Sequence, residues 1–258
     1  MKSTFIRIIA LLSMAIATSI SAKIVERELT LPNQLGSAVM YSPENKDAIS
    51  TGVIVVHEWW GLNDYARNRA KMLAEAGHVA IAVDMYGDGQ IATHPEDAMA
   101  FMQQAFANAD KMTARFNAAK GFLISKGMVN PDKIYAIGYC FGGAVVLNQA
   151  RLGNNLAGVA SFHGSLGTQT PAKSGDIKAR LLVATGGSDP MVPADQVSTF
   201  VQEMASAGVQ FELLNYPDAK HSFTNPGSTE VGKKFNMPLE YNQQADEASW
   251  QALMDFIK

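Results

Sequence analysis

The chain has a single cysteine, and its neighbours are those of a catalytic nucleophile. Cys140 is the central residue of the run Gly138-Tyr139-Cys140-Phe141-Gly142, which is the pattern G-x-S-x-G with cysteine in place of serine. This pattern forms a sharp turn between a strand and a helix, and the N-terminus of the helix favours a thiolate. A small buried cysteine is the alternative, but the flanking glycines and the predicted strand and helix favour a nucleophile.

Such a nucleophile needs an acid and then a histidine later in the chain. Asp189 follows a predicted strand, and His221 lies between the last predicted strand and the last predicted helix. Each has a structural alternative, since Ser-Asp-Pro is common turn chemistry and a lone histidine is often structural. Their joint order and placement predict that Cys140, Asp189 and His221 form a catalytic triad.

Two backbone amides and one carboxylate complete the predicted site. In hydrolases with this turn, the oxyanion hole uses the residue after the nucleophile and a loop after an earlier strand, which nominates the N–H groups of Phe141 and Trp59. Glu58 lies at the start of that loop, and it either forms a structural ion pair or takes part in the thiol chemistry. Further substrate contacts are predicted at Trp60, Tyr86, Asp88, Tyr139, His163, Ser222 and Asn225, with a structural role as the alternative for His163.

Short apolar strands that alternate with helices would position these residues. We predict strands over 23–31, 36–41, 51–56, 78–83, 133–137, 156–162, 180–185 and 209–215, and helices over 67–76, 95–126 (two helices), 141–150, 195–206 and 245–257. The alternation predicts an α/β fold with a mostly parallel sheet and helices on both faces. Ligands bind such sheets at the carboxyl ends of the strands, and the candidate residues lie there.

Two segments are predicted to have no assigned catalytic role. Apolar residues at helical spacing in 95–126 are interpreted as core without a functional role, namely Met99, Met102, Phe106, Met112, Phe116 and Phe122. The segment 227–241 is predicted to be a loop near the mouth of the site, with Lys233, Lys234 and Tyr241 as unassigned candidate contacts.

Composition limits the class of function. The 258 residues are 47% hydrophobic and 17% charged, with a net charge of −3 and no basic run, which indicates one large domain and no nucleic-acid partner. His57-Glu58 lacks the second histidine of the zinc motif H-E-x-x-H, because Gly61 stands there. We therefore expect no metal and no cofactor, a small-molecule substrate, and a monomer, although sequence leaves the oligomeric state open.

The N-terminus has the features of a secretion signal. Lys2 and Arg7 precede an apolar stretch over 8–16, and Ile20-Ser21-Ala22 is typical of a cleavage site. The stretch is short for a membrane span, although an uncleaved anchor is the alternative. We predict a signal peptide over 1–22, one domain over 23–258, and a periplasmic or secreted product without a stable membrane anchor.

These motifs resemble the dienelactone hydrolase family of α/β-hydrolases from about Val53 to the C-terminus. The similar segments are His57-Glu58-Trp59-Trp60-Gly61-Leu62, Val83-Asp84-Met85-Tyr86-Gly87, the cysteine turn 138–143, the acid loop 186–193 and His221-Ser222-Phe223. The resemblance implies an α/β-hydrolase fold, here without a large cap. It implies the roles of the triad, in which Cys140 attacks a carbonyl carbon, His221 moves the proton and Asp189 orients His221. It also implies that Glu58 contacts the resting thiol and helps to form the thiolate when substrate binds.

Two arginines of the family are absent. They bind the carboxylate of dienelactone in its best-known members, and this chain has Gly87-Asp88 and Thr224-Asn225 in their places. We therefore expect a carboxylic ester hydrolase, similar to carboxymethylenebutenolidase or an esterase, that prefers neutral esters or lactones. The alternatives are a weakly catalytic binding module on a hydrolase fold and a thiol redox protein that uses Cys140.

Overall fold

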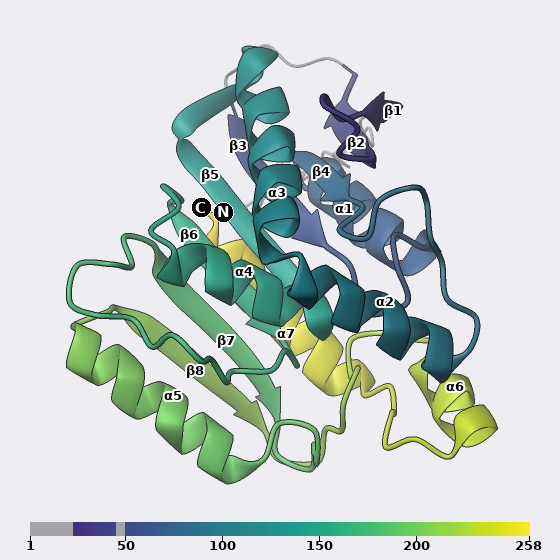
Figure 1. Cartoon of the computed structure of the whole chain (residues 1–258), viewed down its shortest axis with the longest axis vertical. Coiled ribbons are helices and arrows are strands. Elements are labelled where there is room, and N and C mark those ends of the chain that lie inside the picture. The colour runs from purple at the N-terminus through teal and green to yellow at the C-terminus, as the bar shows by residue number, and fades with distance from the viewer. Residues whose placement is uncertain (1–22, 45–49) are drawn as a thin grey trace, which may run out of the picture.

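The apolar runs pair into one eight-stranded sheet (Figure 1). The structure, a computed structural model, describes residues 23–44 and 50–258, so the predicted signal peptide lies outside the described residues. The strands lie in the order β1-β2-β4-β3-β5-β6-β7-β8. Their bounds are β1 Ile24–Thr30, β2 Ser37–Pro43, β3 Ser50–Val56, β4 Val79–Val83, β5 Val129–Tyr139, β6 Gly158–Phe162, β7 Arg180–Gly186 and β8 Phe211–Tyr216. Strands β3 to β8 are parallel, and β2 is antiparallel to β1 and β4, which confirms the predicted mostly parallel sheet.

Helices cover both faces of the sheet (Figure 1). They are α1 Asp64–Glu75, α2 Pro95–Ala107, α3 Ala109–Ser125, α4 Phe141–Arg151, α5 Ala194–Ala207, α6 Ser228–Phe235 and α7 Gln243–Phe256. Helices α2 to α5 pack on one apolar cluster, with Ile54 of β3, whereas α1 and α7 pack on the other, with Val53 of β3. Adjacent β3 side chains thus point to opposite faces, as a strand buried on both sides requires.

The helix α6 corrects the loop predicted over 227–241. A central glycine, Gly232, gives this segment a weak helical signal. Tertiary packing forms the helix instead, because the Phe235 ring stacks on Trp60 with centroids 6.5 Å apart and meets His94 edge to face at 5.0 Å. Gly232 is itself required, since a Cβ there would lie 2.3 Å from the Leu239 carbonyl oxygen.

The parallel strands bring four loops to one edge of the sheet. Glu58 follows β3, Cys140 follows β5, Asp189 follows β7 and His221 follows β8. Among the described residues, no segment between these elements forms a separate cap over that edge, and no helix is long and apolar enough to cross a membrane.

Candidate active site

Cys140 lies on a tight turn between β5 and α4. Its backbone has φ 53° and ψ −114°, a conformation that costs about 1–3 kcal/mol and persists only where the surroundings enforce it. Its N–H donates to the Phe162 carbonyl at 3.0 Å. The flanking glycines allow this close approach, because a Cβ at Gly138 would lie 2.0 Å from the Gly142 oxygen and one at Gly142 would lie 2.3 Å from the Val56 oxygen. The turn therefore presents a half-buried thiol above the N-terminus of α4.

His221 and Asp189 form a buried pair beside this thiol. The Nδ1 atom of His221 lies 2.8 Å from Oδ2 of Asp189, whose other oxygen accepts from the Met191 N–H at 2.8 Å. Burial lowers the pKa of His221, but the neighbouring Cys140 sulfur and the Asp189 carboxylate outweigh burial and raise this pKa to about 10. The imidazole Nε2 is buried without any other hydrogen-bond partner among the described residues, so it is free to serve the thiol.

Two backbone N–H groups are available for an oxyanion. No described group accepts a hydrogen bond from the N–H of Trp59 or of Phe141, the first residue of α4. The Trp59 loop is held in place because Tyr86 donates its hydroxyl hydrogen to the Trp59 carbonyl at 2.8 Å and Gly61 N–H donates to the Glu58 carbonyl at 3.2 Å. Trp59 and Phe141 both line the cavity that contains Cys140, and fixed backbone donors can stabilise a developing negative charge.

Glu58 is buried but bonds to groups other than the thiol. Its Oε1 accepts from the Ser222 hydroxyl at 2.5 Å, and its Oε2 accepts from the Asn225 side-chain amide at 2.7 Å. Burial raises the pKa of Glu58, whereas these two hydrogen bonds and the charge of the nearby His221 lower it in part. The thiol contact that the resemblance implied is therefore replaced here by Ser222 and Asn225, and the carboxylate lies within electrostatic reach of His221.

One buried histidine that sequence reasoning dismissed supports the Glu58 loop. The Nδ1 atom of His57 lies 2.5 Å from the Glu58 carbonyl oxygen, and its Nε2 accepts from the Met85 N–H at 3.1 Å. Burial lowers the pKa of His57, which suits a neutral ring that donates at one nitrogen and accepts at the other. The sequence offered two signals at this position, the failed zinc motif and the family-like segment 57–62, and neither gave His57 a role of its own.

A mostly apolar cavity of about 170 Å³ adjoins Cys140 and His221. It is lined by Trp59, Met99, Met102, Phe106, Cys140, Phe141, Ala144, Ser165, Met191, Val192, His221 and Leu239. The interpretation of Met99 and Phe106 as core is therefore wrong, since they line the cavity and are 41% and 39% exposed. Met102 packs against the core, as predicted, but it also lines the cavity. Met112 and Phe116 are core, as predicted.

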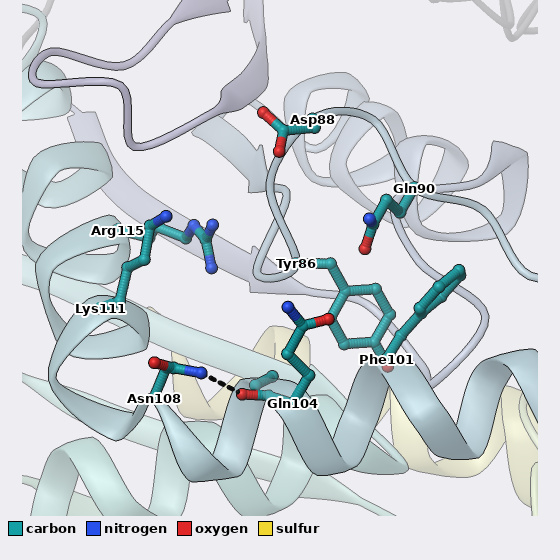
Figure 2. A pocket seen from close by; sticks show the side chains of 9 residues that line it. Tyr86, Asp88, Gln90, Phe101, Gln104, Asn108, Lys111 and Arg115 are labelled. Atoms are coloured by element: carbon teal, nitrogen blue, oxygen red, sulfur yellow. Dashed lines mark hydrogen bonds between the residues drawn. The ribbon is translucent and has the colours of Figure 1, made fainter.

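None of the seven predicted substrate contacts lines this cavity. Tyr86 and Asp88 border a separate polar cavity of about 160 Å³ (Figure 2), and Trp60 and Asn225 border a third beside α6. Ser222, like Asn225, is bonded to Glu58. These side chains hold the catalytic loops in place or face other cavities. Direct contact with a substrate in the Cys140 cavity is therefore not indicated for them.

The other two predicted contacts, Tyr139 and His163, lie in the core behind the triad. The Tyr139 ring stacks on Phe162, with centroids 5.0 Å apart. The His163 ring meets His221 edge to face at 5.3 Å, and its Nε2 lies 2.7 Å from the Thr224 hydroxyl. Both side chains are fully buried, which favours the structural alternative for His163.

The three candidate contacts near α6, two lysines and a tyrosine, also lie away from the Cys140 cavity. Lys233 forms an exposed ion pair with Glu230 at 2.9 Å, and the Tyr241 hydroxyl donates to Asp246 at 3.2 Å. Lys234 borders the cavity beside α6. None of the three lines the Cys140 cavity.

The chain is similar to known hydrolases along most of its length. Residues 37–258 match the model of the dienelactone hydrolase family. Protein usf of Aquifex pyrophilus is 29% identical over 212 residues, or 80% of this chain and 87% of that protein. A protein of Aquifex aeolicus, provisionally named a carboxymethylenebutenolidase, is 26% identical over 211 residues, with the same two shares.

A solved structure shows the same similarity. The crystal structure of a dienelactone hydrolase-like promiscuous phosphotriesterase from metagenomic libraries is 30% identical, with a TM-score of 0.81. The alignment covers 91% of this chain and 97% of that one. Together with the family match, it confirms the resemblance and the α/β-hydrolase fold that the sequence motifs predicted.

Proposed function

This chain belongs to the dienelactone hydrolase family, and we propose from that premise that it cleaves ester or lactone bonds of small substrates with Cys140 as nucleophile. The observation that carries the proposal is the arrangement at the β5–α4 turn. The thiol and the buried imidazole of His221 line the same cavity, and the Nδ1 atom of that imidazole lies 2.8 Å from a buried aspartate. This is the constellation of an activated nucleophile, base and orienting acid.

The reaction proceeds in two halves. The Cys140 thiolate attacks the carbonyl carbon, and the carbonyl oxygen, now negative, accepts hydrogen bonds from the N–H groups of Trp59 and Phe141. The imidazolium of His221 protonates the leaving oxygen, which releases the alcohol and leaves a thioester on Cys140. His221 then takes a proton from water, the hydroxide attacks the thioester carbon, and the thiolate leaves as the acid is released.

Glu58 assists the triad in this proposal through charge. Its carboxylate is fixed by Ser222 and Asn225 and interacts electrostatically with His221. An ionised Glu58 stabilises the imidazolium and hence the thiolate that faces it. The family match and the buried position support a catalytic role, because a purely structural carboxylate would be paired with a cation, and its two hydrogen-bond partners are a hydroxyl and an amide.

The nucleophile is tested by removing the thiol. We expect Cys140→Ala to lose nearly all turnover of p-nitrophenyl acetate, because only binding and the oxyanion hole would remain. Iodoacetamide should abolish activity and label Cys140 alone, and Cys140→Ser should be much weaker than wild type because its hydroxyl has a far higher pKa. Full turnover by the alanine variant would contradict the proposal that Cys140 is the nucleophile.

The same assay separates the two alternative functions. A binding module would hydrolyse none of the esters, whereas a thiol redox protein would consume peroxide through Cys140 without hydrolysis. The chain holds one cysteine, so a peroxide cycle would lack an internal resolving thiol. We further propose that the enzyme needs no cofactor. We also propose that it is exported and that the signal-like segment over 1–22 is cleaved during export.

A further inference from the structure

The wall of the catalytic cavity divides into two sides that come from different elements. Met99, Met102 and Phe106 of α2 and Ala144 of α4 form one side, next to Phe141. Met191, Val192 and Leu239 come from loops on the side of Asp189 and His221. Phe141, which offers one oxyanion donor, packs against Phe106 of the first side with ring centroids 5.3 Å apart. His221, the proton donor, forms a β-bridge with Leu239 of the second side.

The chemistry assigns a part of the substrate to each side. His221 must protonate the leaving oxygen, so the alcohol portion of an ester has to lie on the side of the imidazole. The carbonyl oxygen points to Trp59 and Phe141, and the acyl group is then directed toward α2 and Ala144. This assignment depends on the proposed function, because it takes Cys140 as the nucleophile and His221 as the acid.

We propose that the α2 side is an acyl-binding subsite for a neutral, apolar acyl group about as large as a phenyl ring. The whole cavity, with both sides taken together, measures about 170 Å³, close to the roughly 150 Å³ that accommodates benzene in an apolar protein cavity. An acyl group of this size on the α2 side therefore leaves the alcohol portion at the exposed rim near Met191. Methionine side chains adapt their shape to a ligand, and two of them line this side. Met99, Phe106 and Met191 are each about 40% exposed, so atoms beyond this size leave the buried wall and reach the solvent-exposed rim.

The same wall disfavours an anionic acyl group. Apart from the catalytic His221, no charged side chain among the described residues lines the cavity. Lys111 and Arg115 border the polar cavity on the other side of α2, together with Gln104 and Asn108 of that helix (Figure 2). Arg115 is also engaged there, because its guanidinium donates to the carbonyls of Leu35 and Met85 at 2.9 and 2.8 Å. A substrate carboxylate in the subsite would be desolvated without a partner.

The first test is a series of p-nitrophenyl esters with acetyl, butyryl, hexanoyl, octanoyl and glutaryl groups. We expect kcat/KM to rise by about fourfold for each buried methylene up to about six carbons and then to level off. The glutaryl ester should fall below the butyryl ester despite its longer chain. A flat profile, a maximum at acetyl, or a preference for glutaryl would overturn the subsite.

Two variants move the size limit in opposite directions. Ala144→Leu fills the α2 side, so the ratio of hexanoyl to acetyl kcat/KM should fall by about 16-fold, the effect of two methylenes that are no longer buried. Met102→Ala enlarges it, so the optimum should shift to octanoyl. Leu152→Ala is the control, since Leu152 ends α4 but is exposed outside the cavity, and it should keep the wild-type ratio. Unchanged ratios in both cavity variants would reject the assignment of this wall.

Alkylation of Cys140 gives a measurement that does not need turnover. N-phenyl iodoacetamide should label Cys140 about tenfold faster than iodoacetamide, through burial of its apolar ring, and Ala144→Leu should abolish that advantage. Ester hydrolysis that requires Cys140 but shows no size preference would leave the proposed function standing and overturn the subsite. Selective alkylation without any ester hydrolysis would overturn the proposed function and with it the assignment to an acyl group, and it would leave only an apolar ring-binding site beside Cys140.

Discussion

His221 is the residue whose protonation couples the triad to the stability of the fold. The Cys140 sulfur and Asp189 raise its pKa from 6.5 to about 10 against the effect of burial. A raised pKa in the folded state means that the protonated group stabilises the fold below about pH 6.5 and that this contribution is lost as the pH rises through about 10. The unfolding free energy should therefore contain a pH-dependent part that belongs to this side chain.

The prediction is tested with His221→Gln. Urea unfolding of wild type and variant between pH 6 and pH 10.5 should show a wild-type advantage that shrinks steadily toward the alkaline end, about 1.4 kcal/mol for each unit of pKa shift at most. Groups that do not contact His221 titrate equally in both proteins, so the difference reports His221 together with the two groups coupled to it, Cys140 and Asp189. A difference that stays constant, or grows with pH, would contradict an imidazolium at this site.

Glu58→Gln distinguishes a catalytic carboxylate from a structural one. If Glu58 stabilises the imidazolium, turnover should fall by about 10²–10⁴-fold, the range of general acid–base assistance, while the melting temperature is not lowered. The amide keeps the shape, and it can still accept from Ser222 or Asn225. Because burial raises the pKa of Glu58, the wild type should also lose stability relative to the variant as the pH rises above 4.5.

Three measurements on the Glu58 variant decide the matter together: the melting temperature, kcat, and the pH dependence of Cys140 alkylation. Asn225→Ala is a useful companion, because it removes one hydrogen bond to Glu58 but leaves the carboxylate charge in place. Its turnover should fall less than that of Glu58→Gln. Wild-type turnover together with an unchanged alkylation profile in Glu58→Gln would reject the catalytic role.

The glycines of the turn between β5 and α4 have no room for a side chain. A Cβ at Gly142 would lie 2.3 Å from the Val56 oxygen and 2.6 Å from the His57 oxygen, and backbone atoms at a strand end cannot move aside. We expect Gly142→Ala to lower the unfolding free energy by more than about 3 kcal/mol or to prevent folding, at the upper end of single substitutions.

Gly121 provides a matched control in helix α3. A Cβ there would meet nothing within 4 Å, so Gly121→Ala should raise the unfolding free energy by about 0.5–1 kcal/mol, the difference in helix propensity. Both changes are measured by chemical denaturation of the whole chain. Equal stability of the two variants would show that the β5–α4 turn adapts more easily than its geometry indicates.

Sequence patterns predicted most of the elements because their causes are local. The sequence alone shows buried apolar runs such as Val53 to Val56. It also shows the chain order of Cys140, Asp189 and His221. Helix α6 was missed because its stability comes from Phe235 stacking on Trp60, more than 170 positions away in the chain. Its own glycine weakens the helical signal.

The cavity wall was misread for a different reason. An apolar side chain has the same chemistry in a core and in a substrate pocket, and only the direction in which α2 presents it differs. Met99, Met102 and Phe106 face the Cys140 cavity, whereas Gln104 and Asn108 on another side of the helix face the polar cavity. Periodicity identifies the two sides of this helix but does not reveal what lies against each.

The folded domain and the N-terminal segment over 1–22 have separate tasks in the proposed function, catalysis and export. The described residues begin at Lys23 and form one sheet from β1 to β8, and every candidate catalytic residue belongs to this part. The segment over 1–22 therefore contributes no predicted catalytic group, and its proposed task is export. An exported enzyme with one cysteine has no internal disulfide to form, so Cys140 is available as a thiol in an oxidising compartment.

Export is tested with the full chain expressed in a Gram-negative bacterium. We expect the mature protein in the periplasmic fraction, with Lys23 as its first residue, because Ile20-Ser21-Ala22 has the small residues of a cleavage site. Ala22→Arg should block cleavage and leave a longer, membrane-associated product, and a chain that starts at Lys23 after an added methionine should remain cytoplasmic. Wild-type protein that keeps its first 22 residues and sediments with membranes would establish the uncleaved anchor instead, and full-length protein in the cytoplasm would rule out both.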